Sequence, residues 1–253
     1  MSPRFPQELF DYIIDNAHYD RKVLKACSTV CKSWTTRSRS HLFELLSFCK
    51  PLKLEKWCKG IPPTIDGPSR HVKRLYLDSE DVSFAGEPQS SDPYLDHFTA
   101  LTQVTELTLI GYDDKVHLDT VFRRFSGFKD TLTCLELMST SFGFEEVSRI
   151  AEFFPNLKTL TVRPPDEPIE ESAFQPLRRA TFPHLEGLVF YLSSECPALE
   201  HNLLSGFAEA SMNLEGLAVL GPVSDISAVQ KIVETSTQSL VYLQTSPLGK
   251  SCS

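Results

Sequence analysis

The hexapeptide VKRLYL at residues 72–77 has apolar residues at its first, fourth and sixth positions, and this pattern returns along the chain. The fourth and sixth positions alternate with other residues, as in a short strand that has one buried face. The pattern therefore predicts a series of short strands. Further copies are VTELTL (104–109), LTCLEL (132–137), LKTLTV (157–162), LEGLVF (185–190), LEGLAV (214–219) and a degraded LVYLQT (240–245).

The segments between these strands show the three- and four-residue spacing of helices. Examples are EEVSRIAEFF at 145–154 and DISAVQKIVETS at 225–236, and the turns FPNL and FPHL precede two of the strands. A strand and a helix that recur every 25 to 32 residues resemble a leucine-rich repeat, in which stacked units share one core. An ordinary doubly wound α/β domain is the alternative, but it would show longer apolar strands and a glycine-rich ligand turn.

The N-terminal part differs from the repeats. Residues 1–49 have helical spacing of apolar residues, and residues 50–70 combine a short helix that ends at Gly60 with a proline-rich loop. The expected fold class is α+β multidomain, with an all-α three-helix N-terminal domain (1–49) followed by an α/β leucine-rich-repeat solenoid of six to seven repeats. The solenoid is expected over 71–246, after the linker at 50–70, with a polar tail at 247–253.

The composition and charge of the chain limit the classes of partner that it is expected to bind. The 253 residues carry a net charge of −8, but residues 1–60 hold 11 Lys and Arg against 6 Asp and Glu. The basic part is too small and mixed to favour nucleic acid, and the acidic remainder would repel phosphates. Neither a secretory leader nor an apolar stretch of membrane length is present, so no membrane is expected. Seven cysteines without a C-x-x-C pair predict reduced thiols in the cytoplasm or nucleus.

Motifs for catalysis are missing from the sequence. It has no H-E-x-x-H pair, no G-x-S-x-G turn and no phosphate-binding glycine loop. Cys27 and Cys31 are one helical turn apart, but a structural zinc site needs four ligands, so core packing is the better interpretation. We therefore expect a protein that is not an enzyme and has no catalytic residues, no metal and no cofactor.

The N-terminal segment resembles an F-box. The resemblance lies in Phe5-Pro6-x-Glu8-Leu9, Ile13-Ile14, Leu24 to Ser28, Val30-Cys31-x-x-Trp34 and Leu42-Phe43, with Phe5 where the family usually has Leu. With the repeats, it implies the substrate-recognition subunit of an SCF-type cullin–RING ubiquitin ligase. Such a subunit docks on a Skp-type adaptor and holds the protein to be ubiquitinated. The residues that the resemblance assigns to the adaptor are Phe5, Pro6, Glu8, Leu9, Ile13 and Leu24.

A plainer interpretation of this segment stays open. A repeat array needs a cap over its first apolar edge, and residues 1–60 would serve as one. The protein would then be a non-catalytic leucine-rich-repeat scaffold with a helical N-terminal cap and no role in a ubiquitin ligase.

The strand pattern also predicts a binding face. If the fourth and sixth residues of each copy point inward, the residues between and beside them line the open side. On the last three strands these residues are mostly small or apolar, and exposed apolar surface marks binding sites. The residues expected to bind the unknown protein substrate are Val189, Tyr191, Ala218, Leu220 and Tyr242. Cover by a loop or by residues 246–253, or truncation of a longer repeat protein, are the alternatives.

Overall fold

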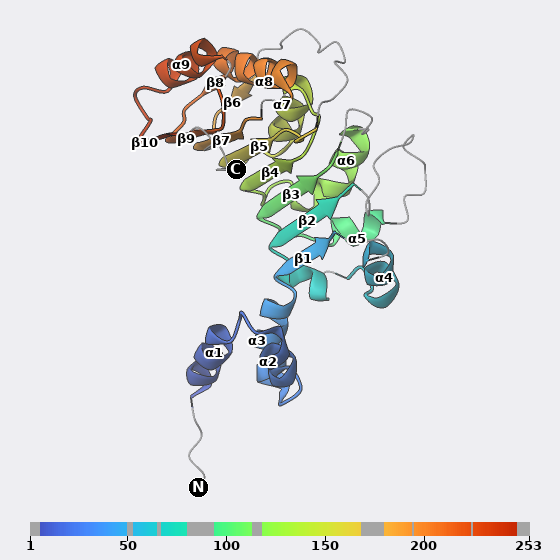
Figure 1. Ribbon diagram of the computed structural model, residues 1–253. Coiled ribbons are helices and arrows are strands. Elements are labelled where there is room, and N and C mark those ends of the chain that lie inside the picture. The colour runs from blue at the N-terminus through green and yellow to red at the C-terminus, as the bar shows by residue number, and fades with distance from the viewer. Residues whose placement is uncertain are drawn as a thin grey trace, which may run out of the picture.

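A single parallel sheet of eight strands organises the protein (Figure 1). The computed structural model describes residues 6–49, 53–64, 67–79, 94–112, 118–167, 180–193, 195–223 and 225–246. The strands follow one another in sequence order across the sheet, and each pairs in parallel with its neighbours. They are β1 (Leu45–Phe48), β2 (Arg74–Asp78), β3 (Glu106–Ile110), β4 (Cys134–Met138), β5 (Thr159–Arg163), β7 (Gly187–Tyr191), β9 (Gly216–Leu220) and β10 (Tyr242–Ser246).

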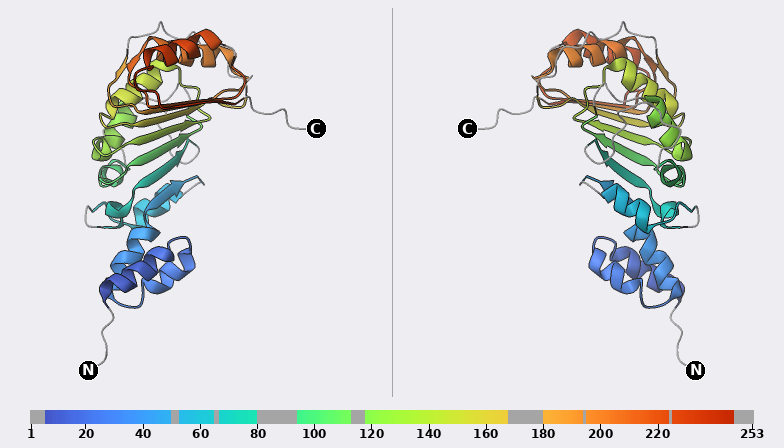
Figure 2. Two further views of the ribbon diagram at one scale, coloured as in Figure 1. Left: turned by 90° about the vertical axis from the view of Figure 1, so that its left-hand side faces the viewer. Right: turned by 90° about the vertical axis from the view of Figure 1, so that its right-hand side faces the viewer.

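Helices cover one face of this sheet, and the sheet curves so that its other face lies on the inner side (Figure 2). Gly206 allows two of these helices to pack closely, because a Cβ there would lie 2.1 Å from the ring of Phe144. The covering elements are α4 (Lys53–Gly60), η1 (Pro68–His71), α5 (Leu95–Thr99), α6 (Leu118–Phe125), η2 (Ser126–Phe128), α7 (Phe144–Phe153), α8 (Pro197–Glu209) and α9 (Ile226–Thr235).

The helical face and the sheet enclose one continuous apolar core. The fourth and sixth residues of the sequence pattern face this core, and Leu75, Leu107, Leu135, Leu160 and Leu188 are all fully buried. Phenylalanine rings from the helices and turns pack between the layers, with Phe144 and Phe207 edge to face at 5.0 Å between ring centroids. The inward orientation that the pattern predicted is therefore confirmed for β2, β3, β4, β5, β7 and β9, whereas Leu243 on β10 is 50% exposed.

The expected fold class was wrong. Instead of an all-α N-terminal domain followed by a repeat solenoid, the structure is an α/β fold with one mostly parallel eight-stranded sheet. The N-terminal segment is not all-α, because its last residues form β1, which pairs with β2. The connections also lack a common repeating unit: α5 has 5 residues, α8 has 13, and a small second sheet joins β6 (Thr181–Phe182) to β8 (Ser211–Met212). The hexapeptide pattern specifies strands, but it does not make the segments between them alike.

Three helices precede β1 and enclose a small core of their own. They are α1 (Gln7–Asn16), α2 (Arg21–Cys27) and α3 (Lys32–Leu42). Asp20 caps α2, because its carboxylate accepts the N–H groups of Lys22 and Val23. The buried residues of this core are Ile14, Leu24, Cys27 and Leu42, and Trp34 and Phe43 pack against it.

Candidate protein-binding surfaces

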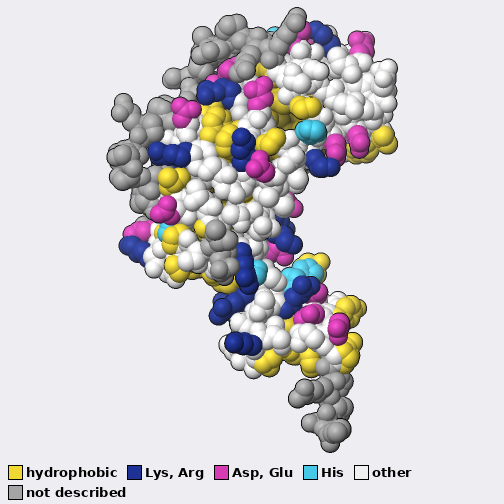
Figure 3. Space-filling model, turned by 180° about the vertical axis from the view of Figure 1, so that it is seen from behind, with side chains coloured by type: hydrophobic (Ala, Val, Ile, Leu, Met, Phe, Trp, Pro, Cys, Tyr) yellow, Lys and Arg dark blue, Asp and Glu magenta, His cyan; other side chains and the backbone are white. Residues whose placement is uncertain are grey.

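The open face of the sheet carries the residues that lie between the inward-facing ones. Strand pairing aligns its first column as Arg74, Glu106, Cys134, Thr159, Gly187, Gly216 and Tyr242, as the sequence predicted. Seen from behind, the molecule is hollowed between the N-terminal helices and the last strands (Figure 3). This hollow lies on the open side of the sheet.

Four of the five predicted substrate residues lie side by side on β7 and β9. Pairing of β7 with β9 sets Val189 beside Ala218 and Tyr191 beside Leu220. Val189, Tyr191 and Leu220 are partly exposed, whereas Ala218 is 8% exposed. Tyr242 is 55% exposed and lies at the other end of these strands, where its phenol donates to Gln244 Oε1 at 2.5 Å.

Two glycines leave bare backbone beside Tyr242. Gly187 and Gly216 pair with each other, and Gly216 pairs with Tyr242. A Cβ built on Gly216 meets nothing within 4 Å, so the space next to the tyrosine ring is open. A partner's main chain can approach the sheet closely here, because no side chain holds it away.

The other half of the open face is polar and acidic. Glu106 and Glu136 flank Cys134, and Thr108 Oγ1 donates to Glu136 Oε2 at 2.9 Å. Burial and then the two carboxylates raise the pKa of the Cys134 thiol to about 11, so this cysteine stays protonated. The face is therefore divided into an acidic part on β3 and β4 and an apolar part on β7 and β9.

The second surface lies on α1. Leu9 is 49% exposed and Ile13 is 53% exposed, and Pro6, Glu8 and Tyr12 are exposed beside them. Of the predicted adaptor residues, three therefore lie on this helix and Pro6 is its N-cap, while Phe5 lies outside the described residues. Leu24 is fully buried, so its assignment to the adaptor surface was wrong: it faces the core of the three helices.

An ion-pair network holds α1 against α3. Arg37 donates to both carboxylate oxygens of Asp15, at 2.6 and 2.5 Å, and His41 Nε2 lies 2.8 Å from Asp15 Oδ1. These contacts, led by the Arg37 hydrogen bond, lower the pKa of Asp15 to about 2. The bidentate pair joins α1 to α3 beside the core residue Ile14, and Leu9 and Ile13 remain exposed to solvent.

The thiol of Cys31 differs from that of Cys134. It is exposed at the N-cap of α3, where it lies 3.3 Å from the Ser33 hydroxyl. Hydrogen bonds from Ser33 and from the Trp34 N–H lower the pKa of Cys31. Sequence spacing had grouped Cys31 with Cys27 as core residues, and this was wrong for Cys31, which lies one residue before α3 and outside the packed face.

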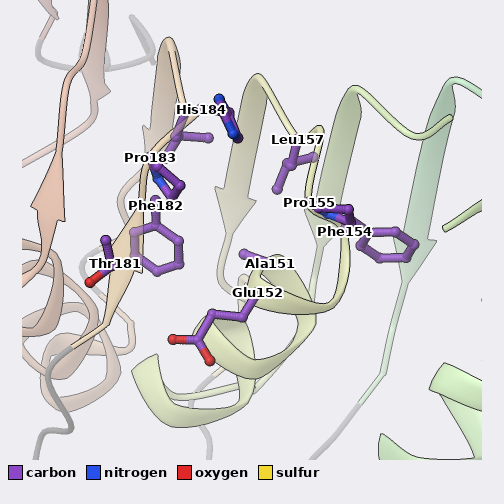
Figure 4. A pocket seen from close by; sticks show the side chains of 10 residues that line it. Ala151, Glu152, Phe154, Pro155, Leu157, Thr181, Phe182, Pro183 and His184 are labelled. Atoms are coloured by element: carbon purple, nitrogen blue, oxygen red, sulfur yellow. The ribbon is translucent and has the colours of Figure 1, made fainter. Parts of the chain in front are cut away.

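A pocket of about 240 Å³ opens between the two Phe-Pro turns (Figure 4). Its walls come from the end of α7 and from the turn after β6, and they are mainly apolar. Glu152 and His184 lie at opposite ends of the pocket, so they do not form an acid–base pair. The other lining residues are Ala151, Phe154, Pro155, Leu157, Thr181, Phe182, Pro183 and Leu185.

Neither a metal cluster nor a membrane-spanning helix occurs in the described part of the chain. In the part of the chain that the structure describes, no three His, Cys, Asp or Glu side chains come together to hold a metal ion. Among the helices described, none has both the length and the apolar character that a membrane span requires.

Comparison with known proteins gives no relative from which a role could be taken. No protein-family model matches the chain, and no curated protein matches its sequence. The fold defines an α/β protein with an open parallel sheet and a small helical unit at one end. Its two candidate binding surfaces are the open face of the sheet and the exposed side of α1.

Proposed function

We propose that this protein is the substrate-recognition subunit of an SCF-type cullin–RING ubiquitin ligase. In this proposal α1 docks on a Skp-type adaptor, and the open face of the sheet binds the protein to be ubiquitinated. The chain itself performs no chemistry and acts in the cytoplasm or nucleus. The observation that carries the proposal is the exposed apolar row on α1, which coincides with the Pro6-x-Glu8-Leu9 string of the F-box resemblance.

The geometry of α1 supports a docking role. Leu9 and Ile13 lie one helical turn apart and are half exposed, although the same helix buries Ile14 completely. Exposed apolar residues that are grouped on one helix favour a partner that covers them. The network of Asp15 with Arg37 and His41 holds this helix in one orientation, which lowers the ordering cost of binding.

The open face supports the second half of the proposal. Tyr191 and Leu220 form a partly exposed apolar pair, and aromatic residues are common anchors at protein interfaces. The acidic side chains of β3 and β4 on the same face favour a target with basic residues, mainly through the rate of association. The two surfaces belong to different parts of the fold, so one protein can bind an adaptor and a target together.

The test is a binding measurement with purified Skp-type adaptor. We expect Leu9→Asp to weaken adaptor binding by a hundredfold or more, on the order expected for a central apolar anchor. Leu243→Asp is the matched control, because Leu243 is 50% exposed and lies on β10 at the far end of the sheet. Equal adaptor binding by both variants, or no binding by the wild type, would refute the adaptor role.

The target surface is tested in the same preparation. The double variant Tyr191→Glu/Leu220→Glu changes partly exposed residues, so it should fold and keep the adaptor while losing a specific set of captured proteins. If the folded variant keeps every target, the open face is not the binding surface.

A further inference from the structure

Two carboxylates on the open face of the sheet have no basic partner among the described residues. Glu106 on β3 is exposed, and its carboxylate makes no hydrogen bond or ion pair with another described residue. Glu136 on β4 is partly buried, and its Oε2 accepts the Thr108 hydroxyl. The Cys134 thiol lies between the two carboxylates and responds to their field, because after burial both of them raise its pKa.

The basic side chains on either side of this pair are held by other carboxylates. Arg74 lies beside Glu106 in the strand pairing, but its guanidinium contacts Glu44 at 3.8 Å. Arg163 on β5 pairs with Asp166 at 3.0 Å. The charge of the face between β3 and β4 therefore stays negative, and it attracts a cation from outside the fold.

A largely buried hydroxyl lies next to the same carboxylates. Thr161 on β5 is 8% exposed, and strand pairing sets it directly beside Glu136 on the open face. Its hydroxyl has no hydrogen-bond partner among the described residues, whereas the Thr108 hydroxyl on the other side of Glu136 has one. Polar groups that are buried to this extent normally have a partner. A donor that binds between Glu136 and Thr161 would supply it.

We propose that Glu106, Glu136 and Thr161 form a site for an arginine side chain of the target protein. This inference rests on the proposed function, because it takes the open face as the target surface. The acceptors favour arginine over lysine. Both oxygens of Glu106, Oε1 of Glu136 and the Thr161 hydroxyl exceed the three donors of an ammonium group, whereas a guanidinium carries five N–H groups in a flat fork.

The apolar pair on β7 and β9 extends the recognised sequence beyond the arginine. Tyr191 lies two strands across and two residues along from Glu136, with Leu220 beside it. At ~4.8 Å between strands and ~3.4 Å per residue the separation is about 12 Å, which an extended chain spans in roughly four residues. Residues four apart in an extended chain point to the same side. We therefore expect the target segment to carry an apolar residue about four positions from its arginine.

The probe is the synthetic peptide acetyl-Ala-Ala-Arg-Ala-Ala-Ala-Leu-Ala-Ala-amide, titrated into the wild-type protein alone by isothermal titration calorimetry. We expect a dissociation constant on the order of 100 µM. The same peptide with citrulline, which keeps the shape of arginine without its charge, should bind at least ~tenfold more weakly. The lysine peptide should lie between the two. Equal binding of the arginine and citrulline peptides, or binding of neither, would overturn the proposal, and a lysine peptide as tight as the arginine peptide would overturn the choice of arginine.

Two substitutions locate the site. Glu136→Gln keeps an acceptor for the Thr108 hydroxyl and should weaken binding of the arginine peptide about tenfold. Glu234→Gln is the matched control, because it changes the net charge equally but lies on α9, on the helical side of the sheet. It should leave the affinity unchanged. Equal weakening by both would assign the binding to net charge and exclude this site.

Thr161→Val tests the hydroxyl separately. It preserves the shape of the side chain and should weaken binding of the arginine peptide several-fold. Because the hydroxyl has no partner among the described residues, the unfolding free energy should not fall. An unchanged affinity for the arginine peptide in this folded variant would overturn the assignment of Thr161 to the site.

The peptide titration contains no adaptor, so it is independent of the adaptor measurement. A wild-type protein that binds the Skp-type adaptor but not the arginine peptide would refute this inference and leave the adaptor role intact. A wild-type protein that binds the peptide but no adaptor would refute the adaptor role and leave the arginine site intact.

Discussion

The two outermost strands of the sheet, β1 and β10, differ in how far their inward-facing side chains are buried. Phe48 on β1 and Leu243 on β10 occupy inward positions, beside Leu77 and Leu217 respectively. Phe48 is 2% exposed, and Leu243 is 50% exposed. An inward position of the strand pattern is therefore core at one end of the sheet and surface at the other, so the pattern alone does not decide burial.

The difference comes from the segment that succeeds each strand. After β1 the chain forms α4, whose Trp57 packs edge to face against Phe48 at 6.4 Å between ring centroids. Lys53 of this helix also donates to the Ser47 carbonyl at 3.5 Å, which places a charge near the edge of β1. After β10 the structure describes no covering element. The β1 end therefore has both an apolar cover and a nearby charge, which the described residues do not supply at the β10 end.

The largest effect is expected at the protected end. Phe48→Ala removes a buried ring between β1 and Trp57, and a substitution of this kind costs roughly 3–5 kcal/mol of unfolding free energy. Urea unfolding monitored by tryptophan fluorescence measures it, because Trp57 adjoins the site and the chain has only one other tryptophan, Trp34. Phe48→Leu keeps most of the apolar volume and serves as the milder control. A Phe48→Ala midpoint equal to that of the wild type would mean that β1 is not packed as described.

A second prediction concerns a buried carboxyl group near the less protected end. Glu200 in α8 is 1% exposed, and it accepts a hydrogen bond from the Ser193 N–H. Burial raises the pKa of Glu200 to about 7, against the opposing effect of that hydrogen bond. The folded protein therefore holds this proton more tightly than the unfolded chain does. Its contribution to stability is complete below about pH 4.5 and is lost as the pH rises to about 7.

Glu200→Gln keeps the hydrogen-bond acceptor and removes the charge. We expect the variant to be more stable than the wild type by roughly 2–3 kcal/mol at pH 8 and nearly equal to it near pH 4.5. Thermal unfolding of both proteins across this range gives the difference, in which the effects of other titrating groups cancel. A constant difference with pH would show that Glu200 is not the group that titrates.

Much of the sheet could be predicted from the sequence. The hexapeptide pattern identified seven of the strands and, for six of them, which side is buried, because inward positions such as Leu75 and Leu77 require apolar residues. β1 was missed, although FELLSF at residues 43–48 fits the same pattern 29 residues before VKRLYL. The resemblance had already assigned Leu42 and Phe43 to the helical segment, so the copy was not recognised. This omission is why the N-terminal segment was expected to be all-α.

The surfaces were less predictable than the strands. Leu9 and Leu24 both belong to the string that resembles an F-box, but one is half exposed and the other is fully buried. Helical spacing does not separate them, because the side of a helix that is covered depends on how α1, α2 and α3 pack together. The network of Asp15 with Arg37 joins residues 22 apart in sequence and gave no signal at all.

The smallest effect is expected at the unprotected end. Leu243→Ala removes a side chain that is already half exposed, so in dilute protein it should cost less than about 1 kcal/mol of unfolding free energy. Urea unfolding at low concentration measures it against Phe48→Ala, which changes an inward position on β1. A cost for Leu243→Ala as large as that for Phe48→Ala would mean that the β10 end is covered in solution. If that large cost appeared only at high concentration, the cover would be a second copy, because only an interaction between chains makes the stability depend on protein concentration.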